Sequence, residues 1–206
     1  MHVFQLILLA SSLLVSGSAL AQRFAPFVSE QDRFKILAPG GTLDIETIDF
    51  QSEYGIVVPA RVYKAETDDG AYTLTVVDYT NAVELHRELG AHISVYGEVD
   101  VRASVAYVAR QIRERAASVE YDNYHYIGRV DGHQLHTTNP DGTKTYAGLY
   151  LLESKLYVID ATMKPGAPPG GIFQQSLDFL DENGNGIMFR TFQEVRKICE
   201  TCTFRR

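Results

Sequence analysis

The second half of the chain alternates between apolar and polar residues in four consecutive runs. These runs are Ser118–Ile127, Gly132–Thr138, Thr143–Leu152 and Lys155–Met163. A period of two residues predicts half-buried strands. The short connections between the runs favour antiparallel pairing, because a parallel crossover needs about a dozen residues or more. We therefore expect a four-stranded antiparallel meander.

One connection of this meander decides how its histidines are placed. Asp131-Gly132 has the composition of a two-residue hairpin turn. Such a turn places Ile127 opposite His136, and we expect His125 and His136 to face opposite sides of the sheet. His133 and His136 are three residues apart, which also puts them on opposite faces of a strand. The pattern therefore predicts no pair of these histidines on one metal ion.

The first half of the chain carries four further strand patterns. They cover Phe34–Leu37, Leu43–Asp49, Gly55–Lys64 and Ala71–Thr80. Pro59 lies inside the third pattern and indicates an edge position or a break, because proline cannot donate to a strand ladder. We expect these strands to join the meander in one fold.

Helical patterns lie before and after the meander. Asn81 is a candidate N-cap for a short helix through Leu89. A longer helix is predicted over Val99–Ala117, where four apolar residues share one face: Val101, Val105, Val108 and Ile112. After the loop Met163–Gly171, three apolar residues recur at helical spacing: Phe173, Leu177 and Leu180. They predict a helix that ends at Leu180. This order of elements predicts an α+β fold, with an antiparallel sheet packed by two to three helices.

The N-terminus has the pattern of an export signal. Residues 1–21 contain no Lys, Arg, Asp or Glu, and a mostly apolar run ends in the small-residue sequence Ala19-Leu20-Ala21. This pattern predicts a signal peptide cleaved before Gln22. An uncleaved anchor or a buried N-terminal helix is the alternative. No later segment reaches membrane-spanning length, so we expect an exported protein, periplasmic or secreted, with no stable membrane insertion after cleavage.

Composition sets the outline of the mature protein. The chain has 206 residues, 45% of them hydrophobic, and a formal net charge of −7. These values suit one globular domain, argue against disorder and argue against a nucleic-acid-binding surface. We expect an N-terminal flank over residues 22–33, a single domain over residues 34–192 and a polar tail over residues 193–206.

The tail contains the two cysteines of the chain, Cys199 and Cys202, in a C-x-x-C arrangement. In an oxidising compartment they are expected to form a local disulfide, which stabilises little because the loop is small. A redox or metal role lacks the usual context. A thioredoxin-type motif opens a helix after a strand, haem attachment needs a following His where Thr203 stands, and zinc needs further ligands. Reduced thiols remain the other alternative.

A partial calcium-loop pattern follows the last predicted helix. Asp181, Asn183 and Asn185 occupy the first three ligand positions, and Gly186 follows them. Position twelve is Phe192 instead of the bidentate Glu that completes such a loop. We interpret the segment as a turn, with weak calcium binding as the alternative, and we expect no other cofactor.

Two sets of residues are candidates for binding a partner or ligand. Arg102, Arg110 and Arg113 fall on one flank of the long helix and suit an anionic group or an acidic partner. Tyr124 and Tyr126 lie in an aromatic-rich strand and suit a recognition surface. The alternatives are a solvated helix flank and ordinary sheet packing.

Motifs for catalysis are absent from the sequence. The mature chain has no H-E-x-x-H and no G-x-S-x-G, and its serines lack a recognisable nucleophile context. A triad assembled by the fold stays open, because triads are defined by geometry. Whether the protein is an enzyme is therefore undecided, with the balance against it.

Three segments carry a resemblance to a known family. They are FKILAPGG at 34–41, KLYV at 155–158 and FQQSLDFLD at 173–181. With the helix before the meander, they make the chain resemble the PsbP-like group, and more narrowly an exported bacterial protein of that shape. The resemblance implies an α-β-α sandwich and a non-catalytic accessory or assembly role, and it assigns no functional residue.

Together these patterns predict an exported, soluble, non-catalytic protein that binds an unknown protein or small molecule. The alternatives are a small extracytoplasmic hydrolase and a calcium-stabilised structural module.

Overall fold

The structure, a computed structural model, describes residues 24–90 and 95–187. The predicted signal peptide and both cysteines, Cys199 and Cys202, lie outside these residues. Within them, no helix is long and apolar enough to cross a membrane.

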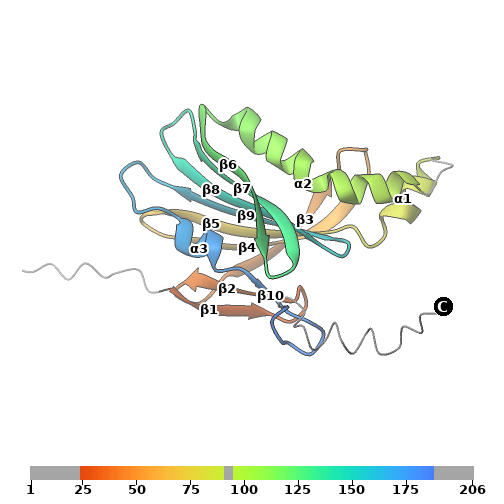
Figure 1. The fold of residues 1–206 in the computed structure, drawn as a ribbon, viewed down its shortest axis with the longest axis horizontal. Coiled ribbons are helices and arrows are strands. Elements are labelled where there is room, and N and C mark those ends of the chain that lie inside the picture. The colour runs from red at the N-terminus through yellow and green to blue at the C-terminus, as the bar shows by residue number, and fades with distance from the viewer. Residues whose placement is uncertain (1–23, 91–94, 188–206) are drawn as a thin grey trace, which may run out of the picture.

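The described chain forms two antiparallel sheets and three helices (Figure 1). The small sheet has the order β1-β2-β10, and the large sheet has the order β3-β4-β5-β9-β8-β7-β6. The strands are β1 (Phe24–Ser29), β2 (Phe34–Pro39), β3 (Asp44–Gln51), β4 (Val57–Glu66), β5 (Gly70–Asp78), β6 (Ser118–Ile127), β7 (Val130–Thr138), β8 (Lys144–Leu152), β9 (Lys155–Met163) and β10 (Asp178–Phe179). The helices are α1 (Ala82–Glu88), α2 (Val95–Arg115) and α3 (Gly171–Gln175). The predicted α+β class is therefore confirmed.

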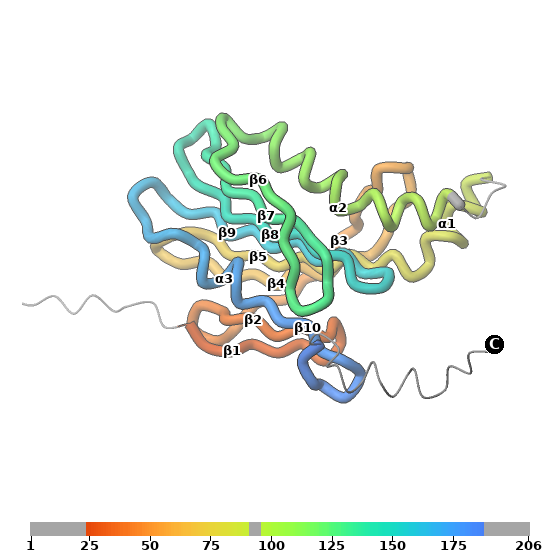
Figure 2. The backbone as a smooth tube through the Cα atoms, in the orientation of Figure 1, coloured from red at the N-terminus to blue at the C-terminus, as the bar shows by residue number. Residues whose placement is uncertain are grey.

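The large sheet lies between α2 on one face and α3 with the small sheet on the other (Figures 1 and 2), and each side contains one hydrophobic cluster. On one face, α2 packs across β7, β8 and β9, and its Val108 and Ile112 are buried among strand residues such as Leu149. On the other face, α3 and the small sheet bury Phe34, Phe173 and their neighbours. The central strands are apolar because both of their faces are covered.

The meander follows the predicted pattern closely. The bounds of β6 and β9 coincide with the predicted runs, and β7 and β8 differ from them by at most two residues. Pro59 lies inside a single strand, β4, and does not divide it. Pairing of β4 with β5 begins only at Ala60, so Pro59 precedes the part of the strand that is paired on both sides.

The predicted turn of the first meander hairpin is wrong by three residues. Ile127 pairs with Val130, so Gly128 and Arg129 form the turn, and Gly132 lies inside β7. A tertiary contact explains the difference: a Cβ at Gly132 would lie 2.2 Å from the ring of Tyr150 on the neighbouring strand. Glycine is needed there for the close approach of a ring and not for a turn.

The strand pairing also corrects the predicted placement of two histidines, because directly opposed residues of antiparallel strands share a face with either turn. His136 pairs with Tyr121, and His125 lies four residues beyond Tyr121 on the same strand. His125 and His136 therefore share one face of the sheet, contrary to the prediction. His133 pairs with Tyr124 on the opposite face, so the predicted separation of His133 and His136 holds.

The last helix is shorter than predicted. α3 ends at Gln175, and the chain then enters β10, where Phe179 pairs with Phe34 of β2. The three apolar residues of the pattern are all buried, but they do not lie on one helix: Phe173, Leu177 and Leu180. Tertiary pairing with β2 outweighs the local helical spacing.

The predicted N-terminal flank is part of the fold. β1 lies within residues 22–33 and pairs along its whole length with β2. Asp32, in the turn between these strands, has no exposed surface.

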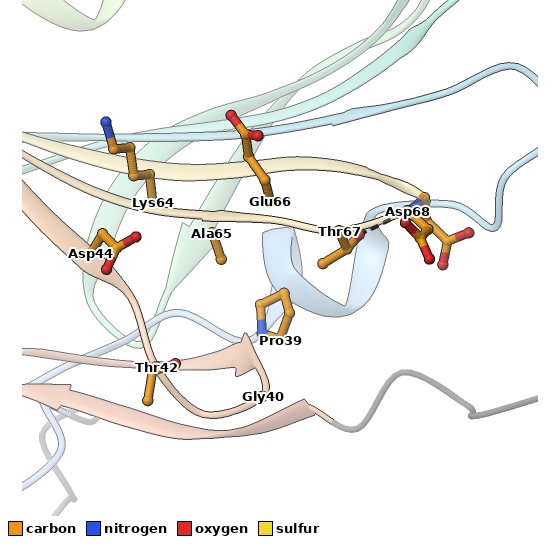
Figure 3. A pocket seen from close by; sticks show the side chains of 10 residues that line it. Pro39, Gly40, Thr42, Asp44, Lys64, Ala65, Glu66, Thr67 and Asp68 are labelled. Atoms are coloured by element: carbon orange, nitrogen blue, oxygen red, sulfur yellow. Dashed lines mark hydrogen bonds between the residues drawn. The ribbon is translucent and has the colours of Figure 1, made fainter.

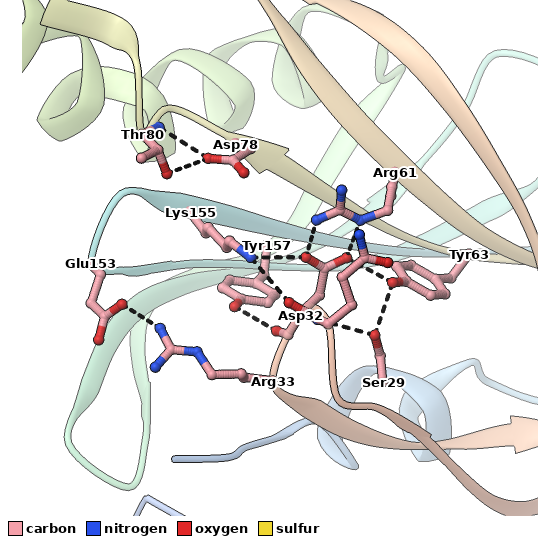
Figure 4. A network of polar contacts seen from close by, with 11 residues as sticks. Ser29, Asp32, Arg33, Arg61, Tyr63, Asp78, Thr80, Glu153, Lys155 and Tyr157 are labelled. Carbon is pink, nitrogen blue, oxygen red and sulfur yellow. Dashed lines mark hydrogen bonds and ion pairs between the residues drawn. The ribbon is translucent and has the colours of Figure 1, made fainter. Parts of the chain in front are cut away.

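Asp32 joins the small sheet to the large sheet (Figure 4). Its carboxylate accepts from Arg61 Nε at 2.5 Å, from Tyr63 Oη at 2.7 Å and from Lys155 Nζ at 3.0 Å, and Arg61 makes a second contact. Its backbone oxygen accepts from Tyr157 Oη at 2.8 Å. Burial raises the pKa of Asp32, but the hydrogen bonds from Arg61, Tyr63 and Lys155 outweigh burial and hold the pKa below its ordinary value.

Candidate functional site

The strongest candidate site is a surface hollow of about 510 Å³ at one end of the large sheet. We call it the hairpin groove, because it lies where α2 meets the ends of the β6–β7 and β8–β9 hairpins. Its lining combines apolar and polar residues: Val105, Tyr124, Arg129, Val130, Asp131, Gly132, His133, Leu151 and Leu152. Concave sites that mix an apolar surface with a few polar groups are typical of ligand binding.

The apolar part of the groove comes from three elements. Val105 lies on α2, Val130 begins β7, and Leu151 and Leu152 end β8. These residues meet because the two hairpins turn at the same end of the sheet, as the pairing of Gly132 with Tyr150 shows. The groove is thus built by the sheet register and by the packing of α2 on the sheet.

A network of charged groups fixes one side of the groove. Arg113 of α2 donates to Asp122 of β6 through Nε at 2.6 Å and through a terminal nitrogen at 3.0 Å. His133 also contacts Asp122. The hydrogen bond from Arg113, with a smaller one from His133, lowers the pKa of Asp122 to about 2. Asp122 therefore stays ionised, and the network holds β6, β7 and α2 together.

Two other polar residues of the groove differ in how they are held. Tyr124 donates to Asp131, which fixes the phenol against the neighbouring strand. Arg129 forms no hydrogen bond or ion pair with any residue of 24–90 and 95–187. Its guanidinium is therefore available to an anionic group.

The structure divides the three predicted arginines. Arg113 is engaged by Asp122 beside the groove, whereas Arg110 pairs with Glu53 at 2.9 Å and lies 5.4 Å over the ring of Tyr107. Arg102 is exposed and has no partner among the described residues. The helix flank is thus not one cationic surface, because Arg110 and Arg113 pair with different carboxylates.

The two predicted tyrosines are both exposed. Tyr124 is 60% exposed and Tyr126 is 54% exposed, and both lie on the face of β6 that bears Asp122. Tyr124 lines the groove and Tyr126 does not. One of the two therefore belongs to the candidate site.

The partial calcium loop, residues 181–186, forms a tight turn after β10. The Oδ1 atom of Asp181 accepts the backbone N–H groups of Asn183 and Asn185, each at 2.8 Å. The side-chain amide of Asn185 also donates to this carboxylate. These bonds hold the Asp181 carboxylate against the backbone of the turn. In the described residues no group of three or more His, Cys, Asp or Glu side chains could hold a metal ion.

A second hollow, of about 580 Å³, lies at the opposite end of the sheet (Figure 3). Four carboxylate residues line it, Asp44, Glu66, Asp68 and Asp69, together with the turn residues around Gly40. Its one cation, Lys64, is held by Glu46 at 2.6 Å. It offers a ligand little apolar surface, so we favour the hairpin groove.

One cluster contains the residue types of a hydrolytic triad, but in another order. His86 Nε2 lies 2.9 Å from Asp100 Oδ2, and Ser52 Oγ donates to the same oxygen at 2.6 Å. In a triad the histidine lies between the serine and the carboxylate. Here the carboxylate lies between them, and all three residues are buried. The cluster therefore ties α1 and α2 to the β3–β4 turn and does not activate the serine.

Sequence reasoning missed most of the groove. Arg129 lies between the predicted elements, Asp131 in a predicted turn, and Leu151 and Leu152 at a predicted strand end, with no signal for a shared site. The available signal was the meander itself, because alternate hairpin turns of a meander lie at the same end of a sheet. The wrong turn at Gly132 hid which residues reach that end.

We compared the chain with protein-family models and with curated proteins, and neither comparison found a match.

Proposed function

We propose that this chain is an exported, non-catalytic binding protein that takes its ligand or partner in the hairpin groove. The observation that carries this proposal is the combination of an apolar lining with Arg129, a cation that no described residue neutralises. A buried apolar group would gain from leaving water, and an adjacent anionic group would pair with Arg129.

The chemistry of the groove favours binding over hydrolysis. His133 is held by Asp122 and Arg113, and no serine or cysteine lines the groove among the described residues. The buried Ser52–Asp100–His86 cluster is far from a nucleophile arrangement, because its serine bonds to the carboxylate and not to the histidine. We therefore place the hydrolase alternative second.

The wider context of the proposal comes from the sequence. The signal-peptide pattern of residues 1–21 supports export to the periplasm or the exterior. The resemblance to the PsbP-like group supports an accessory or assembly role and an α-β-α sandwich. In that description α1 and α2 form one outer layer, and α3 contributes to the other beside the small sheet.

Site-directed crosslinking tests the proposal. A photoreactive amino acid replaces Leu152 in the mature chain, which is then incubated with extract from the compartment in which the protein resides. We expect one dominant adduct, and we expect Arg129→Glu to reduce its yield about fivefold, the effect of about 1 kcal/mol in affinity.

A matched probe at Arg87, an exposed residue of α1, controls for nonspecific capture. Equal adducts from the two probe positions, or an adduct at Leu152 that Arg129→Glu leaves unchanged, would contradict the proposal.

A further inference from the structure

β6 presents an open strand edge to solvent. It is the last strand of the large sheet and pairs only with β7. Eight of its ten residues are exposed. Four large apolar or aromatic residues stand out along it: Val119, Tyr121, Tyr124 and Tyr126.

The opposite edge of the sheet, β3, is protected by charge. Asp44, Glu46 and Asp49 fall within its eight residues, and only Glu46 has an ion-pair partner among the described residues. Uncompensated charge on an edge strand discourages pairing with another chain.

The carboxylates of β6 are neutralised within the chain itself. Asp122 is paired with Arg113 and His133, and Glu120 contacts Lys144 and Thr138. No Lys, Arg or Pro lies on β6. Two copies of this edge therefore meet without the repulsion that a chain of net charge −7 otherwise imposes.

The backbone of β6 has groups free for a second strand. The two-residue turn makes Ile127 and Val130 the first hydrogen-bonded pair, so alternate residues, Tyr124 among them, direct their backbone groups away from β7. The Tyr124 N–H accordingly donates to its neighbour, Asn123 Oδ1, at 3.0 Å instead of to a strand. A bulge between Val119 and Tyr121 limits the regular edge to the residues that follow it.

We propose that two copies of this chain associate by pairing their β6 strands antiparallel around a two-fold axis at Asn123. The two large sheets then form one continuous sheet. The interface is isologous, because the same strand serves both copies.

The register follows from symmetry and charge. A two-fold axis normal to the sheet keeps each residue on its own face, so one residue must lie opposite its own copy. With Asp122 at the axis, the carboxylates of the two copies would face each other and repel. With Asn123 at the axis, the side-chain amides of the two copies face each other. This register also places Tyr121 opposite His125 and Asp122 opposite Tyr124 of the second copy. Aromatic and hydrogen-bonding pairs of this kind stabilise neighbouring strands.

Matched cysteine substitutions test the pairing and its register. In a background with both natural cysteines replaced by serine, Asn123→Cys places two thiols on non-hydrogen-bonded partners about 4.5 Å apart at Cα, within disulfide range. We expect mild oxidation to convert most of this variant to a covalent dimer. Thr47→Cys, at an exposed position of β3, is the control and should stay monomeric.

Sedimentation equilibrium of the mature chain supplies the second test. We expect a reversible dimer at concentrations up to about 0.5 mM, because a single-strand interface is small and weak. Asn123→Lys, which opposes two ammonium groups at the axis, should abolish the dimer, and Thr47→Lys should not.

Other outcomes overturn the proposal. They are a monomer throughout, a dimer insensitive to Asn123→Lys, or crosslinking of Thr47→Cys equal to that of Asn123→Cys. Association of β6 only with another protein also overturns it. This inference is independent of the groove ligand, which the probe at Leu152 tests separately.

Discussion

Two carboxylates, Asp32 and Asp100, are fully buried in this protein, and they are held in opposite ways. Both oxygens of Asp32 accept hydrogen bonds, and two of the donors, Arg61 and Lys155, are cations. The Oδ2 atom of Asp100 accepts from His86 and Ser52, whereas its Oδ1 atom has no partner.

The difference reflects what each carboxylate connects. Asp32 joins the small sheet to two strands of the large sheet, and two charges compensate its own. Asp100 joins two helices to a turn, and its one charged partner, His86, carries charge only when protonated. A buried carboxylate contributes to stability only when hydrogen bonds and opposite charge replace the water it has lost. Asp32 meets this condition more fully than Asp100.

The largest expected effect is that of Asp32→Ala. The substitution leaves Arg61 and Lys155 without their shared anion in a partly buried setting, and it leaves the hydroxyl of Tyr63 with Ser29 as its remaining partner. We expect the free energy of unfolding to fall by about 3–5 kcal/mol, measured by urea denaturation. A loss below about 1 kcal/mol would show that the two sheets are held by apolar packing alone.

A smaller effect follows from acid. Because the pKa of Asp32 is lowered in the folded state, its contribution to stability is present above its ordinary pKa of about 4 and is lost as the pH falls through the lower, folded value. We therefore expect the difference in unfolding free energy between the natural chain and Asp32→Asn to be constant near neutral pH and to shrink below about pH 4. Taking the difference cancels the parallel acid response of Asp122. A difference that grew on acidification would contradict the assignment.

The smallest expected effect is that of Asp100→Asn. The amide keeps an oxygen for His86 and Ser52 and removes a charge that the interior compensates poorly. We expect a loss of only about 1–2 kcal/mol, since a charged acceptor becomes a neutral one. The measurement is the same urea denaturation, with Ser52→Ala as a control that keeps the charge and removes the hydroxyl's bonds to Asp100 and to the Ile56 N–H. A loss as large as that of Asp32→Ala would show that the two carboxylates are equally well compensated.

Sequence reasoning anticipated neither carboxylate. Asp32 fell in the segment interpreted as a flank, because its partners Arg61 and Lys155 are distant in sequence. Asp100 lies inside the predicted helix Val99–Ala117, where no pattern sets it apart. Periodicity reports which residues are buried along one element, and it carries no information on which distant side chains will meet.

The same limit explains the mixed result for the fold and the groove. The meander strands were predictable from alternation, because each pairs with its neighbour in sequence. The turn at Gly128 and the end of α3 were not predictable, because they depend on contacts with residues of other strands. These residues are Tyr150, which lies against Gly132, and Phe34, which pairs with Phe179. Of the residues predicted to bind, Tyr124 and Arg113 lie at the groove, whereas Arg110 is drawn away by Glu53.

The small sheet forms completely only after the last part of the described chain has been synthesised. Its first two strands emerge early in synthesis, but β10 is added only near the end of the described residues, and the Leu37 N–H donates to Ser176, 139 positions later. Until that segment arrives, the apolar surface that Phe179 covers on Tyr150 and Tyr157 stays open to solvent. A truncated or stalled chain that lacks β10 therefore exposes an apolar surface that chaperones and proteases recognise. In a chain that includes β10 this surface is buried.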